Sequence, residues 1–110
     1  IQTISIILSI HFFADFILQT SKQAENKSKS NYYLGCHVLT YSFCLLVIFG
    51  WKYALLNGVV HFCIDYVTSR ITSYLWKKEM VHDFFVVIGL DQLLHTLTLL
   101  GSAVYLGVGI

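Results

Sequence analysis

The sequence predicts an all-α fold, a bundle of four transmembrane helices that forms a single domain over residues 1–110. Of the 110 residues, 56% are apolar and only 12% are charged, whereas a soluble domain carries about 25% charged residues. The chain has no proline and shows no polar/apolar alternation in segments of about 10 residues, the pattern of a membrane β-barrel. Four apolar segments, each near the length of one membrane crossing, account for most of the chain.

Three connections separate the four predicted spans. The first, Thr20–Asn31, is the strongly polar stretch of the sequence. The second is little more than residues 51–52, which predicts an antiparallel hairpin. The third covers residues 76–83, where Asp83 is expected to cap the fourth helix. The predicted spans are residues 1–18, 32–50, 53–73 and 84–109.

The basic residues predict the orientation of the bundle. Lys and Arg near short loops stay on the cytoplasmic side of a membrane. Six of the seven basic residues adjoin the first and third connections, and only Lys52 lies at the second. This distribution places both chain ends outside and makes membrane lipid the expected partner. The net charge of +1, without a clustered basic face, excludes a nucleic-acid partner.

Two pairs of short strings suggest an internal repeat. HFFADF at residues 11–16 resembles HFCIDY at residues 61–66, and HVLT at 37–40 resembles HTLT at 95–98. Two helix hairpins related by an axis along the membrane normal would produce such a pattern. The same strings would also arise without duplication if each helix independently acquired the same spacing of ligand residues. Both interpretations, an internal repeat and convergence, therefore stay open.

Ionisable residues recur inside three of the predicted spans at a spacing of four residues. The pairs are His11 with Asp15, His61 with Asp65, and Asp91 with His95. This spacing places both side chains of a pair on one helical face. Counted from the cytoplasmic ends, the three carboxylates lie at matched depth and the three imidazoles lie one turn deeper. His37, in the second span, lies at the depth of the carboxylates.

These buried charges predict a metal centre. An ionisable residue at the centre of a membrane costs about 2.5–3.5 kcal/mol, so the faces that carry these residues are expected to meet inside the bundle. Imidazole and carboxylate are ligands of Zn, Mn and Fe. We therefore expect His11, Asp15, His61, Asp65, Asp91 and His95 to be metal ligands, with His37 as a further ligand or a catalytic general base. Seven candidates exceed the needs of one tetrahedral ion, so two ions are possible. Gln19 and Gln92 are candidate donors to the carboxylates.

The function that this pattern favours is metal-dependent hydrolysis of a phosphoester or lipid-linked substrate at the cytoplasmic face. Two alternatives remain open. The same residues could carry protons or a divalent cation across the membrane, although the outer parts of the spans offer few polar residues for such a path. The pairs could also act only as packing elements of a structural membrane protein. A bundle this small has little surface for a substrate pocket, which makes a homo-oligomer plausible.

Several long strings also carry a family resemblance. They are HFFADFILQT at residues 11–20, QAENKSKS at 23–30, LNGVVHFCIDYVTSRITSYLWKK at 56–78 and HDFFVVIGLDQLLH at 82–95. Together they resemble domain-of-unknown-function family 3307, small integral membrane proteins of bacteria and their phages. This resemblance implies a bacterial inner-membrane protein and no particular activity. The HxxxD pattern is more loosely similar to membrane-bound metal-dependent hydrolases of the YdjM type, which would imply hydrolysis at a metal centre.

Overall fold

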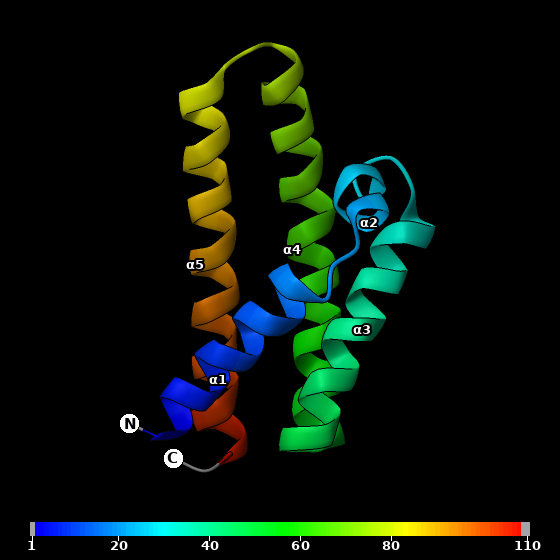
Figure 1. Cartoon of the computed structure of the whole chain (residues 1–110). Helices are drawn as coiled ribbons and strands as arrows, with labels where there is room; N and C mark the ends of the chain where they lie inside the picture. The colour runs from blue at the N-terminus through cyan, green and yellow to red at the C-terminus, as the bar shows by residue number, and fades with distance from the viewer. Residues whose placement is uncertain (1, 109–110) are drawn as a thin grey trace.

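Every element of the computed structural model, which describes residues 2–108, is helical (Figure 1). The predicted all-α class is therefore confirmed for the described part of the chain. The predicted ends of the first and last spans, Ile1 and Gly109, lie outside the described residues. The elements are α1 (Gln2–Phe12), η1 (Phe13–Ile17), α2 (Ser21–Asn26), α3 (Asn31–Phe49), α4 (Trp51–Lys77) and α5 (Val81–Leu106).

Two tight turns connect the three long helices. The predicted hairpin is present between α3 and α4, but its turn is Gly50 and residues 51–52 already belong to α4. Gly50 has φ +93°, a conformation that glycine adopts without a steric penalty. Residues 78–80 connect α4 to α5, so these helices form a long antiparallel pair (Figure 1).

The predicted third connection, residues 76–83, is too long. α4 continues to Lys77, and α5 begins at Val81. Met80 is the residue that precedes α5, so the expected cap at Asp83 is wrong; Asp83 lies in the first turn of α5. There its charge still interacts favourably with the helix dipole. The error arises because a fall in hydropathy marks where a helix leaves apolar surroundings, not where its backbone stops being helical.

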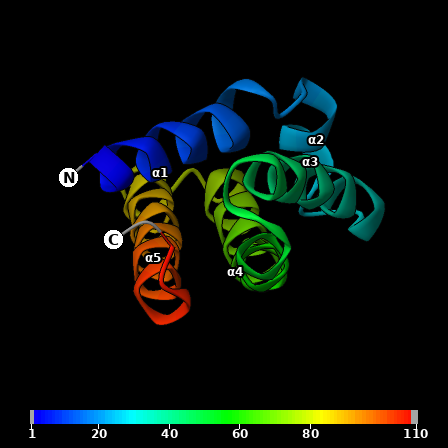
Figure 2. The same cartoon turned by 90° about the horizontal axis from the view of Figure 1, so that it is seen from below.

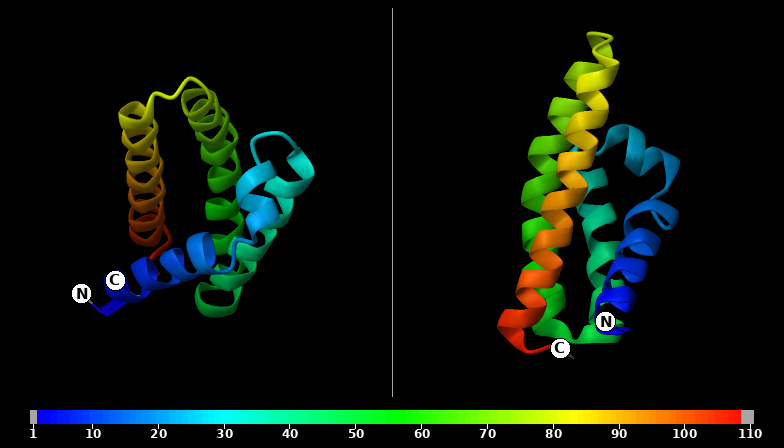
Figure 3. Two further views of the ribbon diagram at one scale, coloured as in Figure 1. Left: turned by 45° about the horizontal axis from the view of Figure 1, so that its top comes forward. Right: turned by 90° about the vertical axis from the view of Figure 1, so that its left-hand side faces the viewer.

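The first connection holds a short helix that the sequence analysis did not predict. The Thr20 hydroxyl accepts a hydrogen bond from the backbone N–H of Gln23, and the Gln23 side chain accepts one from the N–H of Thr20. This reciprocal capping box is a readable signal in the sequence, T-x-x-Q. α2 follows directly and folds the polar connection back over the end of α3 (Figure 3).

The N-terminal segment differs most from its predicted span. α1 and η1 together cover 16 residues, about 24 Å at 1.5 Å per residue. This is shorter than a hydrocarbon core of about 30 Å. The segment crosses one side of the bundle obliquely, from α5 towards α3 (Figures 1 and 2). Two helices, α3 and α5, are long and apolar enough to cross a membrane.

The bundle buries polar and apolar residues in nearly equal number. Among the described residues, ten buried side chains are polar and eleven are apolar, while large apolar side chains cover much of the outer surface. Such an arrangement suits an apolar solvent better than water.

The α4–α5 pair has two unlike ends. The closed end, beside Gly50, is packed with buried apolar residues that include Leu45, Tyr53, Leu99 and Ala103. The open end, beside residues 78–80, has exposed or half-buried side chains along the first turns of α5. The polar side chains described next lie between these ends.

Candidate metal centre

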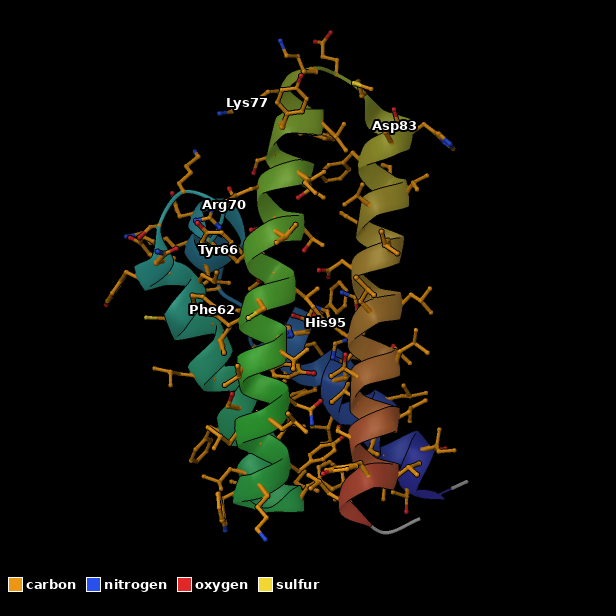
Figure 4. The ribbon with its side chains drawn as sticks, turned by 180° about the vertical axis from the view of Figure 1, so that it is seen from behind. Phe62, Tyr66, Arg70, Lys77, Asp83 and His95 are labelled. Carbon is orange, nitrogen blue, oxygen red and sulfur yellow. The ribbon has the colours of Figure 1, made fainter. Side chains whose placement is uncertain are left out.

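Four elements each contribute to one buried cluster of histidines and aspartates. η1 supplies Asp15, α3 supplies His37, α4 supplies His61 and Asp65, and α5 supplies Asp91 and His95. His95 lies about midway along α5 (Figure 4). All six are buried except Asp91, which is half-buried. The prediction that these faces meet inside the bundle is confirmed.

Four ligand atoms converge on one point. His37 Nε2 lies 2.9 Å from Asp15 Oδ1 and 3.4 Å from Asp65 Oδ2. His61 Nε2 lies 3.6 Å from Asp15 Oδ1, 3.3 Å from Asp65 Oδ2 and 3.0 Å from His37 Nε2. Two ligands of a tetrahedral zinc ion with bonds of 2.0–2.1 Å are about 3.3 Å apart. These five separations therefore match the edges of one tetrahedral coordination shell.

Neutral histidines leave a nitrogen lone pair among the converging atoms. His95 Nε2 donates to Asp65 Oδ1 at 3.0 Å, so in a neutral ring His95 Nδ1 is an acceptor. His61 Nδ1, 3.1 Å away, then donates to it, and His61 Nε2 carries a lone pair. That lone pair faces His37 Nε2 at 3.0 Å and the oxygens of two carboxylates. A cation among these atoms would be attracted to the lone pair and to both carboxylates, so the donor set fits a metal ion.

A second group of possible ligands adjoins the first. Asp15, Asp91 and His95 also bring ligand atoms within 4.8 Å of one another. His95 Nε2 lies 3.4 Å from Asp91 Oδ1. Asp15 belongs to both groups, so its two oxygens could serve neighbouring positions. The described residues thus form one cluster that can hold a metal ion, with donors to spare.

His11 belongs to neither of these groups among the described residues. Its Nδ1 accepts from the Tyr41 hydroxyl at 3.0 Å, and its Nε2 donates to Gln92 Oε1 at 2.9 Å. The nearest oxygen of Asp15 is 3.8 Å from His11 Nε2. The wider π-helical turn of η1 changes the direction of Asp15 relative to an α-helical position four residues after His11. Asp15 therefore contacts His37 of α3 more closely than its partner in sequence.

Comparison with known proteins gives a family for this arrangement. One family model matches residues 3–108. The chain belongs to the family described as Protein of unknown function (DUF3307). No curated protein and no solved structure matches it. Membership in DUF3307 confirms the resemblance found in the sequence and assigns no chemistry, while the looser likeness to YdjM-type hydrolases gains no support from the comparisons.

Glutamine and hydroxyl groups hold the carboxylates of this DUF3307 chain in place. Gln92 Nε2 donates to Asp15 Oδ2 at 3.1 Å and to Asp91 Oδ2 at 3.0 Å, which confirms its predicted role as a donor to the carboxylates. Thr68 donates to Asp91 Oδ1, a contact that the sequence analysis missed. No hydrogen bond from Gln19 to a carboxylate is present among the described residues, and its Oε1 is buried without a hydrogen-bond partner. Such contacts fix the orientation of ligand groups before an ion binds.

Lys27 makes the most important contact with the cluster that sequence reasoning did not predict. Its Nζ donates to Asp65 Oδ2 at 3.1 Å, the same oxygen that faces His37 and His61. Lys27 follows α2 and lies 38 residues before its partner in sequence. Because the unpredicted α2 folds the connection back over the bundle, no local spacing could reveal this contact.

A cavity of about 780 Å³ opens beside the cluster on the side of the open end. Three carboxylates and three ammonium groups line it, from Asp15, Asp65, Asp91, Lys27, Lys29 and Lys77. Serine, threonine, glutamine and aromatic side chains and one isoleucine form the rest of its wall. The cluster is therefore accessible from a space large enough for a small organic molecule.

Proposed function

We propose that this protein is a membrane-embedded, metal-dependent hydrolase that acts on a phosphoester or lipid-linked substrate at the cytoplasmic face. The observation that carries the proposal is the convergence of two imidazole nitrogens and two carboxylate oxygens beside an accessible cavity. Zn, Mn and Fe all accept such a donor set.

The membrane placement rests on length, surface and charge. α3 and α5 have the length and composition of spans, and α4, with 27 residues, is packed between them. Lys27, Lys29, Lys77 and Lys78 lie near the open end, and Lys52 lies at the other. The open end would therefore face the cytoplasm. α1 and η1 would pack across one side of the bundle without crossing the membrane.

The charge of the cavity favours an anionic substrate. Without a metal ion, its three carboxylates and three ammonium groups balance. Each divalent ion adds two positive charges, so the loaded cavity becomes positive and attracts phosphate or another anion. A cation channel would need the opposite sign along its path.

The residues divide into those that hold an ion and those that move a proton. Asp15, His37, His61 and Asp65 would hold the first ion, which would supply an activated water and polarise the scissile group. With one ion, Asp91 remains free to accept the proton of the attacking water; Thr68 and Gln92 orient its carboxylate towards the cavity. A second ion, held by Asp91 and His95, would leave the proton to bulk water in the cavity.

The closed end argues against a path through the membrane. Asn57 Nδ2 donates to Ser102 Oγ at 2.8 Å, and the Tyr53 hydroxyl donates to the carbonyl of Leu99 at 2.9 Å. These hydrogen bonds join α4 to α5 inside the apolar packing, and Asn57 Oδ1 is buried there without a hydrogen-bond partner among the described residues. Hydrolysis at a site reached from one end fits this arrangement better than translocation.

Elemental analysis of protein purified without chelator tests the proposal. We expect one or two transition-metal ions per chain, and hydrolysis of p-nitrophenyl phosphate that chelation abolishes and added metal restores. His61→Ala should lose metal and activity together. His82→Ala is the matched control, because His82 is exposed on α5. Folded protein that retains no metal and binds none on titration would exclude the proposed function.

A further inference from the structure

The cavity beside the metal centre has two chemically different walls. Its polar wall comes from α4 and the connection after α2, and includes Lys27, Ser69 and Ser73. Its apolar wall comes mainly from α5, with Phe84, Phe85 and Ile88, and is completed by Trp76 of α4 and Phe16 of η1. A small hydrophilic phosphoester would use only the first wall.

Two buried polar atoms on the cavity wall have no hydrogen-bond partner among the described residues. They are Ser69 Oγ and Gln19 Oε1. Ser69 is only 6% exposed, so bulk water does not readily satisfy it. Buried polar groups in folded proteins almost always have a partner. A ligand head group in the cavity would supply one, with its oxygens accepting from Ser69 and a hydroxyl donating to Gln19.

Lys27 becomes available when a cation binds. Its ammonium group contacts Asp65 Oδ2, which is also one of the four converging ligand atoms. An ion at the centre would neutralise that oxygen and repel the ammonium. Lys27 would then lie on the cavity wall without its carboxylate partner, where an anionic group could pair with it.

We propose that the cavity binds an amphiphile that carries a phosphate ester, with its head group at Lys27 and Ser69 and its hydrocarbon chain along Phe84, Phe85 and Ile88. The inference rests on the proposed function, because it names the substrate class of the same site. From Asp91 to Phe84, α5 advances about 10 Å at 1.5 Å per residue. An extended chain advances about 1.2 Å per bond, so about eight carbons lie along this wall. Phe85 is 60% exposed, so carbons beyond that length would leave the cavity near the open end of the α4–α5 pair.

Calorimetric titration of zinc-loaded protein in a nonionic detergent tests the inference. The probes are inorganic phosphate, butyl phosphate and decyl phosphate, and protein-free micelles are the blank. Decyl phosphate is expected to bind at least tenfold more tightly than butyl phosphate, and inorganic phosphate most weakly. Equal affinities for the three probes would overturn the inference and favour a soluble phosphoester.

Matched variants test which part of the ligand contacts each wall of the cavity. Ile88→Asn should weaken decyl phosphate at least tenfold and leave inorganic phosphate unchanged, whereas Leu90→Asn, an exposed site on α5 that does not line the cavity, should change neither. Ser69→Ala should weaken all three probes. If Ile88→Asn and Leu90→Asn change the affinity for decyl phosphate equally, the hydrocarbon chain of the ligand does not lie along Phe84, Phe85 and Ile88.

Zinc binding, measured first on the same sample, separates two kinds of failure. Protein that binds zinc but prefers no alkyl phosphate overturns this inference and leaves the proposed function standing. Protein that binds no zinc overturns both.

Discussion

The two ends of the α4–α5 pair are made from the same two helices and yet differ in every property that matters for function. At the closed end, Asn57 and Tyr53 of α4 form hydrogen bonds to α5, and apolar side chains fill the remaining space. At the open end, Ser69 and Phe84 line a cavity. The comparison indicates that one end holds the helices together while the other leaves a cavity open, with the His/Asp cluster between them.

The largest expected effect is the loss of the cluster itself. Asp65 contacts Lys27, His37, His61 and His95, so Asp65→Asn removes the central charge at nearly constant volume. We expect zinc affinity to fall about 100-fold or more, about 2.7 kcal/mol, as measured by competition with a chromogenic chelator. Asp83→Asn, on the exposed start of α5, is the control. Equal zinc affinity in the two variants would place the ion elsewhere.

Glycines at the two ends should respond in opposite directions to alanine. A Cβ on Gly58 would collide with Ser42 of α3, whereas a Cβ on Gly89 meets nothing within 4 Å. Gly58→Ala should destabilise the protein by about 1–3 kcal/mol through overpacking. Gly89→Ala should stabilise it by about 0.5–1 kcal/mol through helix propensity. Denaturant unfolding in mixed micelles measures both; a common sign would mean that Gly58 is packed no more tightly than Gly89.

Removal of Lys27 should strengthen metal binding. Its ammonium group competes with an ion for Asp65 Oδ2, and such a pair interacts by about 1 kcal/mol even under strong screening. Lys27→Met is therefore expected to raise zinc affinity about fivefold, measured by the same chelator competition. Lys52→Met, at the closed end, should leave it unchanged. Weaker zinc binding in Lys27→Met would instead show that Lys27 supports the fold of the cluster.

The smallest effect compares one hydrogen bond at each end. Asn57→Ala removes the bond to Ser102, and Ser73→Ala removes the bond of 2.7 Å between Ser73 Oγ and Ser28 Oγ. Side-chain hydrogen bonds between membrane helices contribute about 0.6 kcal/mol on average. Asn57→Ala should lower the free energy of unfolding by more than that value, because the replacement of this buried side chain also leaves a cavity. Ser73→Ala should lower it by less, because Ser73 is partly exposed. A larger loss of unfolding free energy for Ser73→Ala than for Asn57→Ala would mean that the open end stabilises the protein more than the closed end.

The sequence predicted the helical class, the α3–α4 hairpin and the meeting of the His/Asp faces, because each depends on composition or on residues close in sequence. Matched depth also anticipated the contact between His37 and Asp15. The position of His11 escaped prediction, because it depends on a local π-helical turn. The contact of Lys27 with Asp65 escaped because it depends on how a polar connection folds back across the bundle. A hydropathy profile indicates whether a segment lies in polar or apolar surroundings. Neither the π-helical turn nor the folding back of the polar connection alters that profile.

The N-terminal segment is attached to the rest of the bundle by polar contacts as well as by the buried apolar side chains of Ile7 and Ala14. Asp15 bonds to His37 of α3 and Gln92 of α5, and His11 bonds to Tyr41 and Gln92. An ion at the cluster would therefore act as a cross-link between this segment and the long helices. Withdrawal of the ion would remove this cross-link and weaken the attachment of the segment that carries one of its ligands.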